Sequence, residues 1–279
     1  MKYILLILTL TSLNVKAQNS LNFNKRNVEC EDKWIAYQMD KDSLYTFGFI
    51  YIDEQAGLTF NYEGEFKINK NGVFIPSRII SAGLKSRLQP NRIAIAIIPE
   101  EKFTELHITK TPDWLKFYKD NENSIERLYK WGYMYNGWEE CEKGLEFLEK
   151  AKKIDPNYKG LKVELAYSYN CLNRYDDAIE TLKEALKTEP KDAYINKELI
   201  YSQAKLNQIE LAESSFRKAL KVCDDKTYDS ENAFQILQGY FLEKDTKNFE
   251  KFLKEFKVLL NSDNRFPSII ENMKVELKK

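Results

Sequence analysis

The stretch NRYDDAIETLKEALKTEP, from Asn173 to Pro190, decides the fold of the second half of this chain because its pattern recurs. The segment EECEKGLEFLEKAKKIDP lies 34 residues before it, and NQIELAESSFRKALKVCD lies 34 residues after it. A fixed period of this length predicts a stack of equivalent units. Aligned from residue 125, the three units keep residue size in register, with Trp131, Leu165 and Leu199 at position 7, Gly132, Ala166 and then Ile200 at position 8, Gly144, Ala178 and Ala212 at position 20, Leu148, Leu182 and Phe216 at position 24, and Ala151, Ala185 and Ala219 at position 27.

This pattern resembles the tetratricopeptide repeat family over roughly residues 125–226. The resemblance implies that each unit is a pair of antiparallel helices, with small side chains where the backbones approach and larger ones filling the remaining space. Pro156 and Pro190 are expected to end the second helix of their units, because proline lacks an N–H and clashes with the preceding turn. One pair cannot bury its apolar face alone, so the units are expected to stack into a superhelix.

The segments on either side of residues 124–226 are predicted to close the ends of this stack. Residues 227–279 have the pattern of a degenerate fourth helix pair followed by a C-terminal capping helix. Residues 111–123 predict a connecting or capping helix at the other end. Asn123, with Glu126 three residues later, is expected to cap the first helix of the repeats.

Residues 18–110 change from a helical period to alternation, which predicts a small antiparallel β-rich domain. The run LYTFGFIYID, residues 44–53, alternates aromatic side chains with Thr46, Gly48, Ile50 and Ile52. Asn71-Gly72 is typical of a tight hairpin turn. Five to seven mostly antiparallel strands are expected, together with a short helical segment near residues 100–106. The chain as a whole is predicted to be an α+β protein in which an α-helical solenoid follows the β-rich domain.

The N-terminal residues 1–17, MKYILLILTLTSLNVKA, have the pattern of a signal peptide. A basic residue, Lys2, precedes an apolar run, and Val15-Lys16-Ala17 precedes a cleavage point. The apolar run is too short to cross a bilayer, which needs about 20 residues. We therefore expect an exported protein, periplasmic or secreted, that is soluble after removal of the leader and has no stable membrane insertion.

The charge balance bears on the kind of partner. The chain has 43 basic and 43 acidic residues, so its formal net charge is zero. Nucleic acids and anionic membranes favour a clustered basic face. The composition therefore argues against nucleic acid or an anionic membrane as the main partner. The resemblance implies a protein or peptide partner instead, while the partner's identity and self-association into a homo-oligomer stay open.

The resemblance also implies where a partner would bind. In the tetratricopeptide family, ligands usually lie in the concave groove formed by the first helix of each pair. Tyrosine contributes a large flat contact with one hydroxyl, and the Asn amide can pair with a peptide backbone. The alternatives are that the tyrosines pack on one another or on the β domain, or have no role. The positions carried over to this sequence are Tyr129, Tyr133, Asn136, Tyr167, Asn170, Tyr194, Lys197, Tyr201 and Lys205.

The spacing of the four cysteines argues against a metal site and leaves a disulfide open. In the tetratricopeptide arrangement Cys141 and Cys171 fall at the same edge of neighbouring units, where a disulfide and two free thiols are both compatible with the sequence. Cys30 and Cys223 have no predicted partner. The cysteines are widely spaced and the chain has one histidine, so the paired spacing of a zinc site is missing, and no metal or cofactor is expected.

The sequence therefore favours a non-catalytic interaction module or scaffold in the cell envelope. It has no GxSxG, HExxH or glycine-rich phosphate loop, so enzymatic chemistry is not expected. A hydrolase built on His107 is one alternative. The other is a glycan-binding protein that uses the aromatic residues of the β domain, although burial in the sheet core also explains such residues. These are Trp34, Tyr37, Tyr45, Phe47, Phe49, Tyr51, Phe60 and Tyr62.

Overall fold

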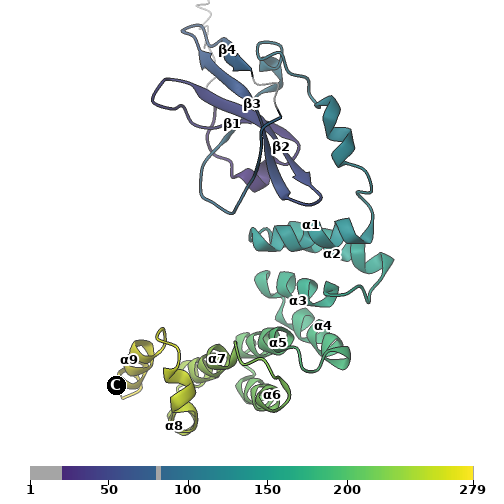
Figure 1. Cartoon of the computed structure of the whole chain (residues 1–279). Helices are drawn as coiled ribbons and strands as arrows, with labels where there is room; N and C mark the ends of the chain where they lie inside the picture. The colour runs from purple at the N-terminus through teal and green to yellow at the C-terminus, as the bar shows by residue number, and fades with distance from the viewer. Residues whose placement is uncertain (1–20, 80–82, 279) are drawn as a thin grey trace, which may run out of the picture. The chain divides into compact units, whose positions relative to one another are not determined.

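The structure is a computed structural model that describes residues 21–79 and 83–278. The predicted signal peptide, residues 1–17, lies outside the described residues. The chain divides into two compact units, Met1–Tyr118 and Lys119–Lys279. The first is built around a β-sheet and the second is helical (Figure 1), which confirms the predicted α+β class. None of the described helices combines the length and apolar character needed to cross a membrane.

The first unit holds an antiparallel sheet with the strand order β4, β3, β2, β1, β6, while β5 pairs with the opposite end of β3. The long strands β2 and β3 form its central hairpin. Asn71-Gly72 lies in the turn between β3 and β4, and Gly72 has a φ of 75°, which glycine adopts readily. The described residues contribute six strands: β1 (Lys33–Ala36), β2 (Tyr45–Asp53), β3 (Gly57–Ile68), β4 (Phe74–Ile79), β5 (Lys85–Arg87) and β6 (Ala96–Ile97).

Aromatic side chains form the core of this first unit. Phe47 is fully buried and its ring lies edge-on to Phe66, with centroids 5.6 Å apart. A short 3₁₀-helix, η3 (Asp113–Tyr118), packs on the same core, and the ring centroid of Trp114 lies 5.0 Å from that of Tyr51. The sequence predicted a connecting or capping helix over residues 111–123. Residues 113–118 instead complete the aromatic core of the sheet, because their apolar side chains find partners there.

The second unit is a solenoid of helix pairs. From α1 to α8 each helix contacts the next one, and α1, α3, α5 and α7 also contact one another in series. These four helices therefore form one continuous face of the stack (Figure 1). Within the described part of the chain the helices are α1 (Ile125–Gly137), α2 (Cys141–Ile154), α3 (Leu161–Cys171), α4 (Tyr175–Thr188), α5 (Ala193–Lys205), α6 (Ile209–Val222), α7 (Asp229–Leu242), α8 (Thr246–Asn261) and α9 (Pro267–Glu276).

The 34-residue period of the sequence appears as a period in the backbone. The helices α2, α4 and α6 begin 34 residues apart, at Cys141, Tyr175 and Ile209. Two positions before each start, one residue adopts the left-handed conformation and turns the chain between the helices of a pair. These residues are Glu139, Asn173 and Asn207, with φ of 62°, 59° and 59°.

The small residues of the period allow the paired helices to approach closely. A Cβ atom on Gly132 would lie 2.4 Å from Cγ of Leu148, so no larger residue fits there without a shift. Ala178 and Ala212, which follow Gly144 at position 20, are fully buried. Leu148 fills the space between helices, as the resemblance implied, and is also fully buried.

The first helix begins one residue later than its predicted cap. Ser124, rather than Asn123, is the N-cap of α1, and its Oγ accepts a hydrogen bond from the backbone N–H of Arg127 at 3.3 Å. Both residue types cap helices well, so the sequence alone did not distinguish the two positions.

The fourth pair departs from the period, as its sequence does. Helix α8 begins at Thr246, 37 residues after α6, and Lys244 takes the left-handed turn position with a φ of 57°. Phe249 is buried at the position where the regular units have Gly144, Ala178 and Ala212, and Phe252 is buried beside it. Helix α9 covers this pair, since its Ile270 and Met273 are buried in the same cluster.

Candidate functional site

A groove on the α3 and α5 side of the solenoid brings together several of the residues that were predicted to bind a partner. Its volume is about 460 Å³. The turn after α1, the C-terminal half of α3 and the middle of α5 all contribute to it. Its lining residues are Glu139, Tyr167, Asn170, Cys171, Lys197, Glu198 and Tyr201.

Two tyrosines from equivalent repeat positions give the groove its aromatic character. Tyr167 and Tyr201 are both half-buried, on α3 and α5. Burial, followed by the charge of Glu198, raises the pKa of Tyr167. Burial, followed by Tyr175 and then Glu198, raises the pKa of Tyr201. Both hydroxyls therefore stay protonated at neutral pH and can donate as well as accept hydrogen bonds.

The other predicted groove tyrosines lie in different surroundings. Tyr133 has the same repeat position as Tyr167 but lies outside the lining of the groove, with 59% of its surface exposed. Tyr129 pairs with Tyr158 at a centroid distance of 5.2 Å, and burial raises its pKa to about 12. Tyr194 pairs with Tyr228 at 5.8 Å. The structure therefore brings two of the predicted tyrosines together and places the other three outside the groove.

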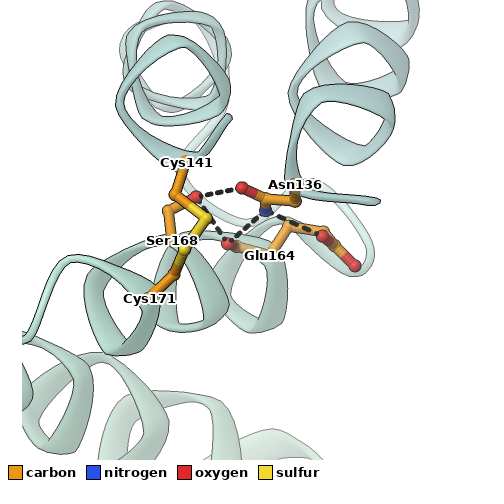
Figure 2. Close-up of a disulfide and its surroundings, with 5 residues drawn as sticks. All are labelled: Asn136, Cys141, Glu164, Ser168 and Cys171. Carbon is orange, nitrogen blue, oxygen red and sulfur yellow. Dashed lines mark hydrogen bonds between the residues drawn. A yellow bond between two sulfur atoms is a disulfide. The ribbon is translucent and has the colours of Figure 1, made fainter. Parts of the chain in front are cut away.

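Asn136 and Asn170 have a structural role that the sequence analysis did not predict. Only 2% of Asn136 is exposed, and its Nδ2 donates to the backbone oxygen and Oε2 of Glu164 at 3.0 and 3.1 Å. Ser168 donates from Oγ to Asn136 Oδ1 at 2.8 Å, and Figure 2 shows this cluster beside a disulfide. The amide of Asn136 is thus fully used inside the stack.

The same arrangement recurs one repeat later. Nδ2 of Asn170 donates to Oε2 of Glu198 at 2.8 Å, and Oγ of Ser202 donates to Oδ1 of Asn170 at 2.7 Å. Asn170 lines the groove, but its amide is already paired, so the proposed pairing of these two amides with a peptide backbone is not supported. The signal that could have revealed this is a Glu and a Ser four residues apart, which recur with the same period as the Asn.

Lys197 and Glu198 form a charge pair in the groove wall. Lys197 Nζ lies 2.8 Å from Glu198 Oε1 and 3.8 Å from an oxygen of Glu231. Burial alone would lower the pKa of Lys197, but the charge of Glu198 and the hydrogen bond to it outweigh burial and raise the pKa. Lys205 is exposed, and its Nζ lies 5.2 Å from the ring centroid of Tyr201.

A disulfide forms one edge of the groove. It joins Cys141, the first residue of α2, to Cys171, the last residue of α3, with the Cα atoms 6.2 Å apart. These are the two cysteines that the sequence analysis placed at one edge of the stack. The bond crosses the boundary between the first and second helix pairs, next to the Asn136 cluster (Figure 2). Cys30 and Cys223 are free and buried, and burial raises the pKa of Cys30 to about 11.

The aromatic residues of the β unit offer little surface to a glycan. Trp34, Phe47, Phe49, Tyr51 and Phe60 are all buried. Tyr37, Tyr45 and Tyr62 are half-buried. Most of these residues therefore belong to the core of the sheet. This is the explanation that was set beside a sugar-binding face.

His107, the residue on which the alternative of a hydrolase depends, lies in an exposed turn. His107 is exposed and has a φ of 57°, and its backbone N–H donates to Thr104 O at 3.3 Å in a turn. Over residues 21–79 and 83–278, no group of three or more His, Cys, Asp or Glu residues is placed to hold a metal ion.

Two further hollows lie on the helical unit and are less suited to a partner segment. One, of about 360 Å³, is lined by the loop after α2 and the end of α4. The other, of about 320 Å³, lies between α4, α5 and α6. The groove that contains Tyr167 and Tyr201 is larger than both and has two aromatic side chains from equivalent positions.

Comparison with known proteins supports the assignment of the repeats. Residues 142–199 match the sequence profile of the tetratricopeptide repeat family. This range includes most of α2, all of α3 and α4 and half of α5, and therefore most of the groove. No curated protein matches the sequence significantly.

Solved structures similar to this chain include MamA and tetratricopeptide repeat proteins. MamA of strain MSR-1 is 20% identical, with 59% of this chain and 87% of that one covered and a TM-score of 0.45. A MamA fragment from Desulfovibrio magneticus RS-1 is 17% identical, with 59% and 86% covered and a TM-score of 0.45. A thermophilic tetratricopeptide repeat protein of Thermus thermophilus is 19% identical, with 59% and 85% covered and a TM-score of 0.41.

Proposed function

We propose that this tetratricopeptide repeat protein is a non-catalytic interaction module that holds an extended segment of a partner protein in the groove between α3 and α5. The observation that carries the proposal is the groove itself, in which neighbouring repeats present Tyr167 and Tyr201 from equivalent positions. Its volume of about 460 Å³ lies within the range of ligand-binding clefts, roughly 300–1,000 Å³.

The groove is suited to a peptide because its walls are already ordered. The buried bonds of Asn170 to Glu198 and Ser202 hold α3 against α5. The Cys141–Cys171 disulfide holds α2 against α3 at the groove edge. A partner segment therefore loses little free energy to ordering the site, and tyrosine rings add contact area at low conformational cost.

We also propose that the protein acts in the cell envelope after export, either in the periplasm or outside the cell. The signal-peptide pattern of residues 1–17 supports export, and the Cys141–Cys171 disulfide supports an oxidising compartment, since such bonds are rare in the cytosol. The partner in this proposal is a protein of the same compartment, and the module acts as a scaffold that presents or positions it.

Affinity capture with cross-linking in the native cells tests the groove directly. The parent protein is compared with a variant that carries Tyr167→Ala and Tyr201→Ala, and with the single variant Tyr133→Ala as the matched control. Tyr133 has the same residue type and repeat position but lies outside the groove. Circular dichroism checks that all three proteins keep the same helix content.

We expect the parent and the Tyr133→Ala variant to retain the same partner, and the double variant to lose it. Loss of two aromatic contacts of about 1 kcal/mol or more each weakens binding by at least tenfold. If the double variant retains the partner at the parent's level, the groove is not the binding site.

A further inference from the structure

The groove contains a carboxylate that the fold leaves unpaired. Glu139 lies in the turn between α1 and α2 and is exposed, with the left-handed φ of 62°. Its carboxylate has no hydrogen-bond or ion-pair partner among the described residues, and it lines the groove with Tyr167 and Tyr201. The left-handed turn, a conformation that Glu adopts at a cost, places this residue at the edge of the groove.

The remaining charges of the groove do not neutralise Glu139. Lys197, the one cation of the lining, is already paired with Glu198 at 2.8 Å and lies 3.8 Å from Glu231. The lining therefore has two carboxylates and one ammonium group, a negative excess. Lys205 lies next to the lining, over the ring of Tyr201 at 5.2 Å.

The electrostatic effect of these carboxylates reaches the tyrosine hydroxyl. After burial, the charges of Glu198, Glu139 and Glu164 raise the pKa of Tyr167, and Lys197 only partly opposes them. The charged groups that act on this hydroxyl are therefore mostly negative, an environment that disfavours an acidic ligand and favours a cation.

The tyrosine rings of this surface already attract cations from the chain itself. Lys205 Nζ lies 5.2 Å from the ring centroid of Tyr201, and Lys197 Nζ lies 5.5 Å from that of Tyr194. Both distances are within the roughly 6 Å at which an ammonium group interacts with an aromatic face. No cation of the described chain lies over the ring of Tyr167 in the same way, so that ring is available.

We propose that the partner segment places an arginine or lysine side chain in this groove, over the ring of Tyr167 and against the carboxylate of Glu139. The inference rests on the proposed function, because it names the side chain that the groove selects in its partner. A guanidinium or ammonium group would gain both an aromatic face and a charge-assisted hydrogen bond there.

Display selection of random 12-residue peptides on the full chain supplies the probe. Peptides that bind the parent but not the Tyr167→Ala, Tyr201→Ala variant are sequenced, synthesised with a fluorescent label and titrated by fluorescence polarisation. Each peptide is also made with its basic residues replaced by glutamine. The protein variants are Glu139→Gln and, as the matched control, Glu142→Gln, which removes an exposed carboxylate of the first turn of α2 outside the groove.

We expect the groove-dependent peptides to share an arginine or lysine, and its replacement by glutamine to weaken binding about tenfold. Glu139→Gln should weaken binding of the basic peptide, so that its affinity falls close to that of the glutamine peptide. Glu142→Gln should leave the affinities of both peptides unchanged. Groove-dependent peptides without a basic residue, or a basic peptide that binds Glu139→Gln as tightly as the parent, would overturn the inference and leave the proposed function intact. A selection that yields no groove-dependent peptide would overturn both.

Discussion

Ser168 donates a hydrogen bond of 2.8 Å to the side-chain oxygen of Asn136, across the boundary between the first and second helix pairs. The same bond recurs between Ser202 and Asn170, at 2.7 Å, across the next boundary. All four side chains are at most 5% exposed. The stack is therefore held by a repeated polar contact in addition to its apolar core.

Removal of one member of this contact should destabilise the solenoid. In Asn170→Ala, Ser202 and Oε2 of Glu198 lose their shared partner in a buried position. We expect the free energy of unfolding to fall by about 1–3 kcal/mol, the cost of leaving buried polar groups unsatisfied. Urea unfolding followed by circular dichroism measures it.

A double-mutant cycle shows whether the two side chains act together. Ser202→Ala should lower the free energy of unfolding by less in the Asn170→Ala variant than in the parent, because the hydrogen bond that it removes is already absent. If the losses of the two single variants simply add in the double variant, the hydrogen bond contributes nothing to stability.

The disulfide should contribute to stability by linking two repeats. It closes a loop with a sequence separation of 30 residues. The variant with both Cys141→Ser and Cys171→Ser is expected to lose about 2–4 kcal/mol of unfolding free energy, mainly through the greater freedom of its unfolded chain. Treatment of the parent with a reductant should lower its urea midpoint to that of the variant and leave the variant unchanged. An unaltered midpoint of the parent after complete reduction would refute this.

The left-handed turn residues provide a matched pair of stability variants. Lys244 and Asn207 occupy equivalent turns, with φ of 57° and 59°, and both are exposed. Asparagine tolerates this conformation better than lysine, so Lys244→Asn should stabilise the protein and Asn207→Lys should destabilise it, each by up to about 1 kcal/mol. Thermal unfolding midpoints should move in opposite directions. If both midpoints move in the same direction, the backbone conformation of these residues does not determine the change in stability.

Glu164 should make stability depend on pH. Burial raises its pKa above the ordinary 4.5, although the hydrogen bond from Asn136 partly opposes this. The folded state then binds the proton more tightly than the unfolded state. The stability that this group contributes is therefore fully present below pH 4.5 and is lost as the pH rises through the folded pKa.

The variant Glu164→Gln keeps an acceptor for Asn136 and removes the charge. It should have a higher urea midpoint than the parent at pH 7, and the gap should close as the pH falls toward 4.5. Glu146→Gln, at an exposed position of α2, is the control and should show no such closing gap. If the difference in urea midpoint between Glu164→Gln and the parent is the same at pH 5 and pH 8, the predicted pH dependence is wrong.

The repeats could be predicted from the sequence because their signal depends on residue size at fixed positions. Gly132 and Ala178 had to be small for the helices to meet, and this constraint is visible without knowledge of the fold. The sheet was predictable for a similar reason, since alternation in residues 44–53 reflects the two faces of β2.

The site was less predictable because the same repeat position can face the groove, a neighbouring ring or solvent. Tyr133 and Tyr167 are equivalent in sequence, yet only Tyr167 lines the groove. Asn136 and Asn170 were predicted to contact a ligand because an Asn can bind a peptide, whereas their actual partners come from the next helix pair. Glu139 was missed because its position in a turn gave no pattern.

The most direct measurement of the central claim replaces Tyr167, Tyr201 or Tyr133 singly by the photo-cross-linking residue benzoylphenylalanine and irradiates the native cells. The replacement keeps an aromatic ring at each position, so binding is preserved while contacts are recorded. The groove account predicts that positions 167 and 201 cross-link to one segment of one partner protein, and that position 133 does not. Cross-links from position 133 alone, or an absence of cross-links from positions 167 and 201 in a properly folded protein, would contradict it.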